Sequence, residues 1–221
     1  MKQVLVYTPV GDYRGGAEKS FYTCVEAMLE NGFNVTVITS CGGEFIEDLN
    51  QLGAKTIITN ISENCLCIGR RNILKFLLVF IKLNFLSYKI IAKQKPKLVY
   101  CNDSLSLQWC ILSLAFKLKR PSVIVHERLA DVRPAHKFCF SILKKKFSVI
   151  FTSEFMKQKI SSHFTTYQLI PTVPNYLTFV KAWVCIVKTR SFVMLVASQD
   201  GSKFIRYFKQ CPIYQALNDL I

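Results

Sequence analysis

The chain has 221 residues, of which 51% are hydrophobic and 19% charged, and this composition excludes an intrinsically disordered protein. The 29 Lys and Arg outnumber the 14 Asp and Glu, which gives a formal net charge of +15 and favours anionic partners: phosphorylated small molecules, nucleic acid or an anionic membrane surface. The basic residues are spread along the chain without an aromatic-interleaved stripe, so no nucleic-acid partner is expected. A nucleic-acid-binding α/β domain is the last alternative, and a Lys-rich genome composition is the other source of such a charge.

The nine cysteines are an odd number at irregular spacings. Cys65 and Cys67 form a lone C-x-C without a second Cys or His pair at zinc spacing, so we expect no metal site. No secretory signal opens the chain, since Met1 leads directly into a strand-like run. We therefore expect a reducing cytoplasmic location, either free or at the cytoplasmic face of a membrane.

The first forty residues predict a strand, a helix and a second strand. Residues 3–9 are a β-branched and aromatic run, typical of a buried strand. A glycine-punctuated loop occupies 10–16, and an apolar helical period begins at Ala17. Gly32 ends that helix, and residues 33–40 form the next strand. This order is a βαβ unit, which is the building block of parallel sheets.

The same pattern repeats with variations as far as residue 152. Expected helices cover 45–52, 73–93, 104–117 and 136–146, and expected strands cover 55–59, 97–101, 122–126 and 148–152. The last two strands are continuous apolar runs, which suit strands covered by helices on both faces. The predicted fold class is α/β, a Rossmann-like, doubly wound and mostly parallel sheet.

The segment 73–91 is the most hydrophobic stretch of the chain. Lys75, Lys82, Asn84 and Lys89 interrupt it, and such residues are costly at the centre of a bilayer. We therefore expect a mostly buried helix. A helix lying at a membrane interface is the first alternative, with peripheral attachment to an anionic membrane as its consequence. A membrane-spanning helix is the second.

The character of the chain changes near Pro171. The run IPTVPNY predicts a linker, which we place at 167–190. One buried strand and one helix follow it, and these cannot bury their own apolar faces. They therefore either pack on the first domain or belong to a second domain. We expect a first domain over 1–166 and the short start of a second, truncated domain over 191–221.

Gly15 and Gly16 stand at the first strand-to-helix turn. Glycines let a backbone approach a ligand closely, and the N-terminus of a helix favours phosphate. The spacing matches neither G-x-G-x-x-G nor the P-loop, so no standard nucleotide fingerprint applies. A turn that merely needs glycine is the alternative interpretation.

Other candidate site residues follow the ends of predicted strands. Asn102 and Asp103 come after strand 97–101, where polar residues line the ligand crevice of open α/β sheets; capping of the next helix is the alternative. His126, with Glu127 beside it, can act as an acid, a base or a phosphate ligand, or be purely structural. Lys203 is a candidate phosphate ligand or a solvated lysine at a helix start.

These segments together resemble the N-terminal, acceptor-side domain of glycosyltransferase family 4 enzymes, which have the GT-B fold. The resemblance rests on GGAEKSFYTCVEAMLENGFNVTVIT, KPKLVYCNDSLSL, PSVIVHER, FSVIFTSEFMKQKI, IPTVPNY and FVMLVASQDGSKFIRYF. It implies a hexosyltransferase-type enzyme that moves a sugar from a nucleotide-sugar donor to a polysaccharide or lipid-linked glycan acceptor. The nucleotide sugar is then a co-substrate, and no cofactor is implied.

The resemblance also implies roles for single residues. Gly15, Gly16 and Lys203 would face the donor phosphates, His126 would be catalytic near the transferred sugar, and Asn102, Asp103 and Glu127 would face the acceptor. The family's E-x-x-x-x-x-x-E element and its Gly-rich donor loop have no place in this sequence. We therefore expect little or no transferase activity from these residues alone. A non-catalytic binding remnant of such an enzyme is the alternative.

Overall fold

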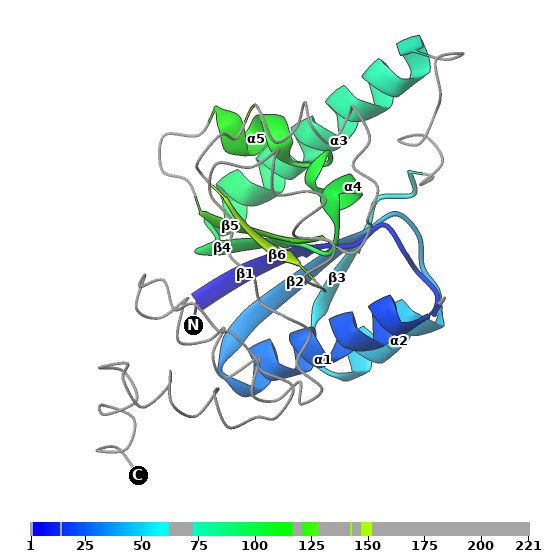
Figure 1. The fold of residues 1–221 in the computed structure, drawn as a ribbon, viewed down its shortest axis with the longest axis vertical. Helices are drawn as coiled ribbons and strands as arrows, with labels where there is room; N and C mark the ends of the chain where they lie inside the picture. Colours follow the sequence, from blue (N-terminus) through cyan, green and yellow to red (C-terminus); the bar gives the residue numbers. More distant parts are fainter. Residues whose placement is uncertain are drawn as a thin grey trace.

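The computed structural model describes residues 2–13, 15–61, 73–116, 121–127, 142 and 147–151. A six-stranded, wholly parallel sheet forms the centre of this part, in the order β3-β2-β1-β4-β5-β6 (Figure 1). The strands are β1 Lys2–Tyr7, β2 Phe33–Thr39, β3 Lys55–Ile58, β4 Leu98–Cys101, β5 Ser122–Glu127 and β6 Ser148–Phe151. The helices are α1 Gly16–Glu30, α2 Glu44–Gln51, α3 Ile73–Gln94, α4 Ser104–Leu107 and α5 Ile111–Ala115.

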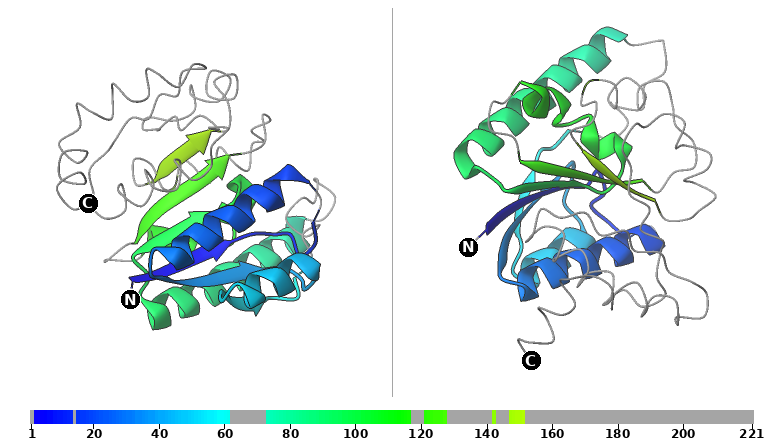
Figure 2. Two further views of the ribbon diagram at one scale, coloured as in Figure 1. Left: turned by 90° about the horizontal axis from the view of Figure 1, so that it is seen from below. Right: turned by 60° about the vertical axis from the view of Figure 1, so that its left-hand side comes forward.

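Helices cover both faces of the sheet, as the two views of Figure 2 also show. One face packs against α1 and α2, and the other against α3, α4 and α5 (Figure 1). Successive residues of a strand point to opposite faces, so Val4 and Val6 of β1 join the α1 side while Leu5 and Tyr7 join the α3 side. The prediction of a Rossmann-like, doubly wound sheet is confirmed.

The strand order reverses between β1 and β4. From β1 the chain adds β2 and β3 on one side, then returns to place β4 against β1 and continues outward to β5 and β6. In open α/β sheets, ligands bind at the carboxyl ends of the strands where this reversal occurs. The loops that follow β1 and β4 are therefore the first place to look for a site.

The prediction of one helix over 104–117 is wrong. The structure has two short helices, α4 and α5, separated by a turn at 108–110. Asn84 of α3 stabilises the break between the two helices. Its side-chain amide N–H donates to the Gln108 carbonyl at 2.8 Å, and its side-chain oxygen accepts from the Leu112 N–H at 2.8 Å. A side chain from a distant helix thus satisfies backbone groups that a continuous helix would pair internally.

Helix α3 agrees with the prediction in its bounds but not in its burial. Its inner face is buried at Leu83, Ile90 and Ile91, whereas Leu74 is 73% exposed and Phe85 is 58% exposed. The expectation of a mostly buried helix is therefore wrong for its outer face. Among the residues that the structure describes, no helix has both the length and the apolar character needed to cross a bilayer.

Several predictions concern residues outside the described part. These are the helix over 136–146 apart from residue 142, the end of the first domain at 166, the linker over 167–190 and the second domain over 191–221. They stay predictions.

Candidate functional site

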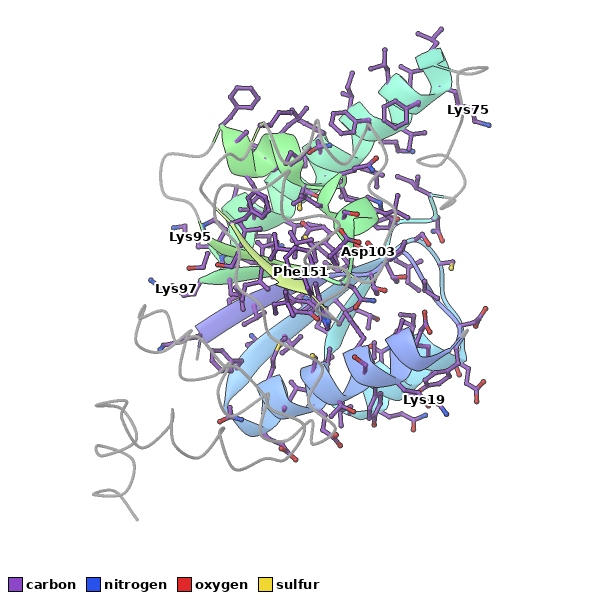
Figure 3. The ribbon with its side chains drawn as sticks, viewed as in Figure 1. Lys19, Lys75, Lys95, Lys97, Asp103 and Phe151 are labelled. Carbon is purple, nitrogen blue, oxygen red and sulfur yellow. The ribbon has the colours of Figure 1, made fainter. Side chains whose placement is uncertain are left out.

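The loops after β1 and β4 start side by side. The Asn102 N–H donates to the Tyr7 carbonyl at 3.0 Å, which ties the residue after β4 to the last residue of β1. Asn102 is buried and Asp103 half-buried, and Figure 3 shows Asp103 at the carboxyl edge of the sheet, opposite the edge marked by Lys97. The two loops are thus joined by a backbone hydrogen bond at the reversal point of the sheet.

The loop after β1 is held by the loop after β2. The Ser40 hydroxyl donates to the Pro9 carbonyl, and the Thr39 hydroxyl lies 3.2 Å from the Val10 carbonyl. A Cβ at Gly43 would overlap the Asp12 carboxylate, and one at Gly11 would lie within 3 Å of backbone oxygens of the β2 loop. Two glycines therefore permit a backbone approach that no other residue would allow.

Tyr13 fastens the same loop to α2. Its hydroxyl donates to Asp48 Oδ2 at 2.7 Å, and its ring meets the Phe45 ring edge-on with centroids 5.1 Å apart. Desolvation and then the neighbouring Asp48 carboxylate raise the pKa of Tyr13 to about 12. The phenol therefore stays protonated and keeps its hydrogen bond across the whole neutral range.

Gly15 and Gly16 open α1 without a structural need for glycine. A Cβ at either residue would meet nothing within 4 Å, and Gly15 has an extended backbone with φ 170°. Among the described residues, no side chain caps the N-terminus of α1, so its first N–H groups lack a capping acceptor. The arrangement suits an anionic group that comes close to the backbone.

His126 lies at the carboxyl end of β5 and is only 2% exposed. Its Nδ1 is 2.6 Å from the Tyr100 hydroxyl, and the two rings meet edge-on. Tyr100 in turn lies against Phe21 of α1, with ring centroids 6.3 Å apart. His126 is therefore on the α1 face of the sheet, in the same layer as the Gly15–Gly16 turn.

Glu127 belongs to the opposite face. His126 pairs with Ile150, which packs on the α1 side, whereas Glu127 pairs with Phe151, which packs on the α3 side. Residues that are paired across parallel strands point to the same face. The sequence placed His126 and Glu127 together, but the sheet separates their side chains.

Asp103 caps α4. Its Oδ1 accepts from the Ser106 N–H at 2.6 Å and from the Ser106 hydroxyl. The alternative interpretation of this residue as a helix cap is thus confirmed, while a contact with an acceptor stays a prediction. Lys203 lies outside the described residues, and among those described no three His, Cys, Asp or Glu side chains gather as metal ligands.

Sequence reasoning missed Tyr100, Gly11 and Gly43. The sequence does indicate a role for Tyr100, because a tyrosine within the buried apolar run KLVYC needs a hydrogen-bond partner for its hydroxyl. In the structure that partner is His126. The sequence around Gly11 and Gly43 does not indicate their role, because each glycine is required only by its close approach to a loop about thirty residues away in the chain.

Comparison with known proteins adds a family match. The family model described as Glycosyltransferase Family 4 matches residues 14–176. No curated protein sequence matches the chain.

Similar folds occur among solved structures. A glycosyltransferase from Rickettsia africae ESF-5 has a TM-score of 0.59 at 19% identity, with 90% of this chain and 50% of that chain covered. Anabaena Alr3699/HepE in complex with UDP-glucose has 0.51 at 14%, covering 85% and 50%. A sucrose-phosphate synthase chain from Thermosynechococcus elongatus has 0.58 at 12%, covering 86% and 99%. At these identities the likeness concerns the fold, and this chain spans about half the length of the first two.

Proposed function

The chain belongs to glycosyltransferase family 4, and from that premise we propose that it is the acceptor-side half of an enzyme of hexosyltransferase type. The reaction is transfer of a sugar from a nucleotide-sugar donor to a polysaccharide or lipid-linked glycan. The family match over residues 14–176 carries this proposal. The similar fold of an Anabaena protein seen with UDP-glucose supports the donor class and a hexose.

The donor diphosphate is assigned to the N-terminus of α1. The uncapped N–H groups and the helix dipole favour its charge, and the open space in front of Gly15 and Gly16 admits it. Lys203 is assigned to the same phosphates by resemblance alone. The close packing of Gly11 and Gly43 supports a diphosphate site at the N-terminus of α1, because this packing fixes the loop that leads into the helix.

By family resemblance, His126 is assigned to the transferred sugar. It lies at the carboxyl edge, on the α1 face that carries Gly15 and Gly16. Tyr100 acts as a positioning residue, since a 2.6 Å hydrogen bond at Nδ1 holds the imidazole in one orientation. An imidazole held in one orientation lowers the barrier to transfer, because it need not be ordered when the substrate binds.

The acceptor is assigned to the loop after β4 and its surroundings. Asn102 stands at the reversal point of the sheet, and Asp103 presents a carboxylate at the edge while it caps α4. Glu127 faces the α3 side, so it would reach an acceptor from a different direction than His126 reaches the donor sugar.

A polypeptide of these 221 residues alone is proposed to bind ligand without appreciable turnover, as a binding-only module would. The departing diphosphate needs groups on both walls of a cleft, and the chain spans half the length of the Rickettsia and Anabaena chains. A cytoplasmic location belongs to the same proposal, because nucleotide sugars would meet the site there.

The test is ligand binding by the full chain. Isothermal titration with UDP, UDP-glucose and uridine separates the diphosphate from the base. We expect both diphosphates to bind and uridine to bind at least tenfold more weakly, because most of the attraction comes from charge at α1. Equal binding of uridine and UDP, or binding of neither UDP nor UDP-glucose, would overturn the donor site.

A further inference from the structure

The outer face of α3 carries a continuous apolar stripe. Its members are large side chains that stay between 44% and 73% exposed: Leu74, Leu77, Leu78, Ile81, Phe85 and Tyr88. They recur at three- and four-residue intervals, so they line one side of the helix over four turns. Exposed apolar surface of this extent marks a contact surface.

The inner face of α3 is locked, so the stripe cannot turn inward. Asn84 bridges the ends of α4 and α5, and the Ser87 hydroxyl donates to the Trp109 carbonyl at 2.8 Å. Leu83 and Ile91 are fully buried beside them. Rotation of the helix would break these hydrogen bonds and expose the core.

A row of lysines runs along one flank of the stripe. Lys75, Lys82 and Lys89 are exposed and recur every seven residues, which is close to two turns. The Lys89 ammonium lies 4.5 Å from the centre of the Phe85 ring, so its stem runs along apolar surface while its charge stays at the edge. The flank is not balanced by acids, since the sequence contains no Asp or Glu between residues 64 and 102.

We propose that α3 docks the protein on an anionic phospholipid surface. The stripe enters the boundary between headgroups and acyl chains, and the lysines meet the lipid phosphates. An amphipathic helix with a lysine-rich polar flank and Leu, Ile and Phe on the other side has the chemistry for this position. The proposal goes beyond the transferase function and concerns a surface outside the donor site.

The direction of α3 relates the docking surface to the candidate site. The helix runs antiparallel to the strands, so its N-terminal end projects past the sheet on the side of Asp103 (Figures 1 and 3). Lys75 marks that end, and Lys97 marks the opposite edge (Figure 3). Docking through α3 therefore places its N-terminal end, which lies beyond the carboxyl edge of the sheet, at the bilayer surface, where the glycan of a lipid-linked acceptor begins.

A second copy of the chain fits the surface less well. If two antiparallel α3 helices packed through their stripes about a two-fold axis, each lysine flank would lie along the lysine flank of the partner. Like charges at that separation destabilise the contact. Anionic lipid meets the same flank with opposite charge.

The experiment is flotation of the full chain with vesicles in the absence of nucleotide sugar, so that its outcome is independent of the donor site. One vesicle is phosphatidylcholine, and the other contains about one third phosphatidylglycerol, a strongly anionic surface. We expect binding to the anionic vesicle only, and a loss of about a hundredfold in partition for the K75Q/K82Q/K89Q variant. The control variant K2Q/K19Q/K55Q removes three exposed lysines from other elements and should lose less than tenfold.

A second pair of variants tests the stripe. Ile81→Gln should lower partition into anionic vesicles at least tenfold, whereas Ile58→Gln, at an exposed residue of β3, should not. Circular dichroism confirms that the variants keep their fold. Equal loss in both lysine variants, or equal flotation with neutral vesicles, would overturn the proposal. A stable dimer by light scattering that Ile81→Gln dissociates, with no flotation, would assign the stripe to a second copy instead.

Discussion

The Tyr100 hydroxyl and His126 Nδ1 lie 2.6 Å apart in a layer that is closed to solvent. The contact joins β4 to β5 and fixes an imidazole at the carboxyl edge of the sheet. Tyr7 of β1 is buried on the other face of the sheet, where its hydroxyl lies near Ser87 of α3. Of these two buried tyrosines, only Tyr100 faces the imidazole.

Tyr100→Phe should destabilise the protein by about 1–3 kcal/mol, because it leaves a buried imidazole nitrogen without its partner. Tyr88→Phe is the control, because Tyr88 is 51% exposed. It removes a hydroxyl from a half-exposed side chain and should change the free energy of unfolding by less than about 0.5 kcal/mol. Urea unfolding followed by circular dichroism measures both. A similar free energy of unfolding for the two variants would contradict the role given to the Tyr100–His126 hydrogen bond.

Gly43→Ala should disturb the loop after β1 although Gly43 belongs to the loop after β2. The added methyl group would overlap the Asp12 carboxylate and approach the Gly11 carbonyl, so the two loops must move apart. We expect a loss of about 1–3 kcal/mol in the free energy of unfolding and weaker binding of UDP. Gly42→Ala is the control, because its methyl group would meet only the tip of Ile58 at 3.4 Å. Equal effects at both glycines would show that the loops do not depend on this close approach.

The sheet could be predicted because each strand is a short apolar run between turn residues. Strands β4, β5 and β6 lie within one residue of their predicted bounds, since continuous apolar runs covered on both faces are a local property of the sequence. The break between α4 and α5 could not be predicted, because Asn84 stabilises it from another helix. Hydrophobic content alone also cannot tell which face of α3 is buried when apolar residues surround the helix.

The candidate site was predictable in place but only partly in detail. Strand ends and a glycine turn indicated the carboxyl edge, and the reversal of strand order between β1 and β4 agrees with that place. The alternation of side chains along β5 then separated His126 from Glu127. Neighbours in sequence share a place along a strand but not a face of the sheet.

Asp103 caps α4, and two substitutions separate the contribution of its capping oxygen from that of its carboxylate charge. Asp103→Asn keeps a good N-cap and should change the free energy of unfolding by less than about 0.5 kcal/mol. Asp103→Ala removes the acceptor for the Ser106 N–H and should cost about 0.5–2 kcal/mol. Thermal and urea unfolding measure the pair. If Asp103→Asn costs as much as Asp103→Ala, the carboxylate charge rather than the capping oxygen stabilises this turn.

Gly16→Ala separates a structural glycine from one that faces a ligand. Gly16 is the first residue of α1, and a methyl group there meets nothing within 4 Å. Alanine favours a helix over glycine, so the variant should gain up to about 1 kcal/mol of stability. The same methyl group would stand where the proposed donor diphosphate approaches the backbone, so UDP affinity should fall by about tenfold or more.

Gly53→Ala is the control for Gly16→Ala, because we expect it to lower stability and leave UDP binding unchanged. Its methyl group also meets nothing within 4 Å, but its φ of +102° strains any residue with a Cβ. It should therefore lose stability by about 1 kcal/mol and keep the UDP affinity of the unaltered chain. Thermal unfolding and isothermal titration give both quantities for each variant. A Gly16→Ala protein that is more stable and still binds UDP unchanged would remove the diphosphate from the N-terminus of α1.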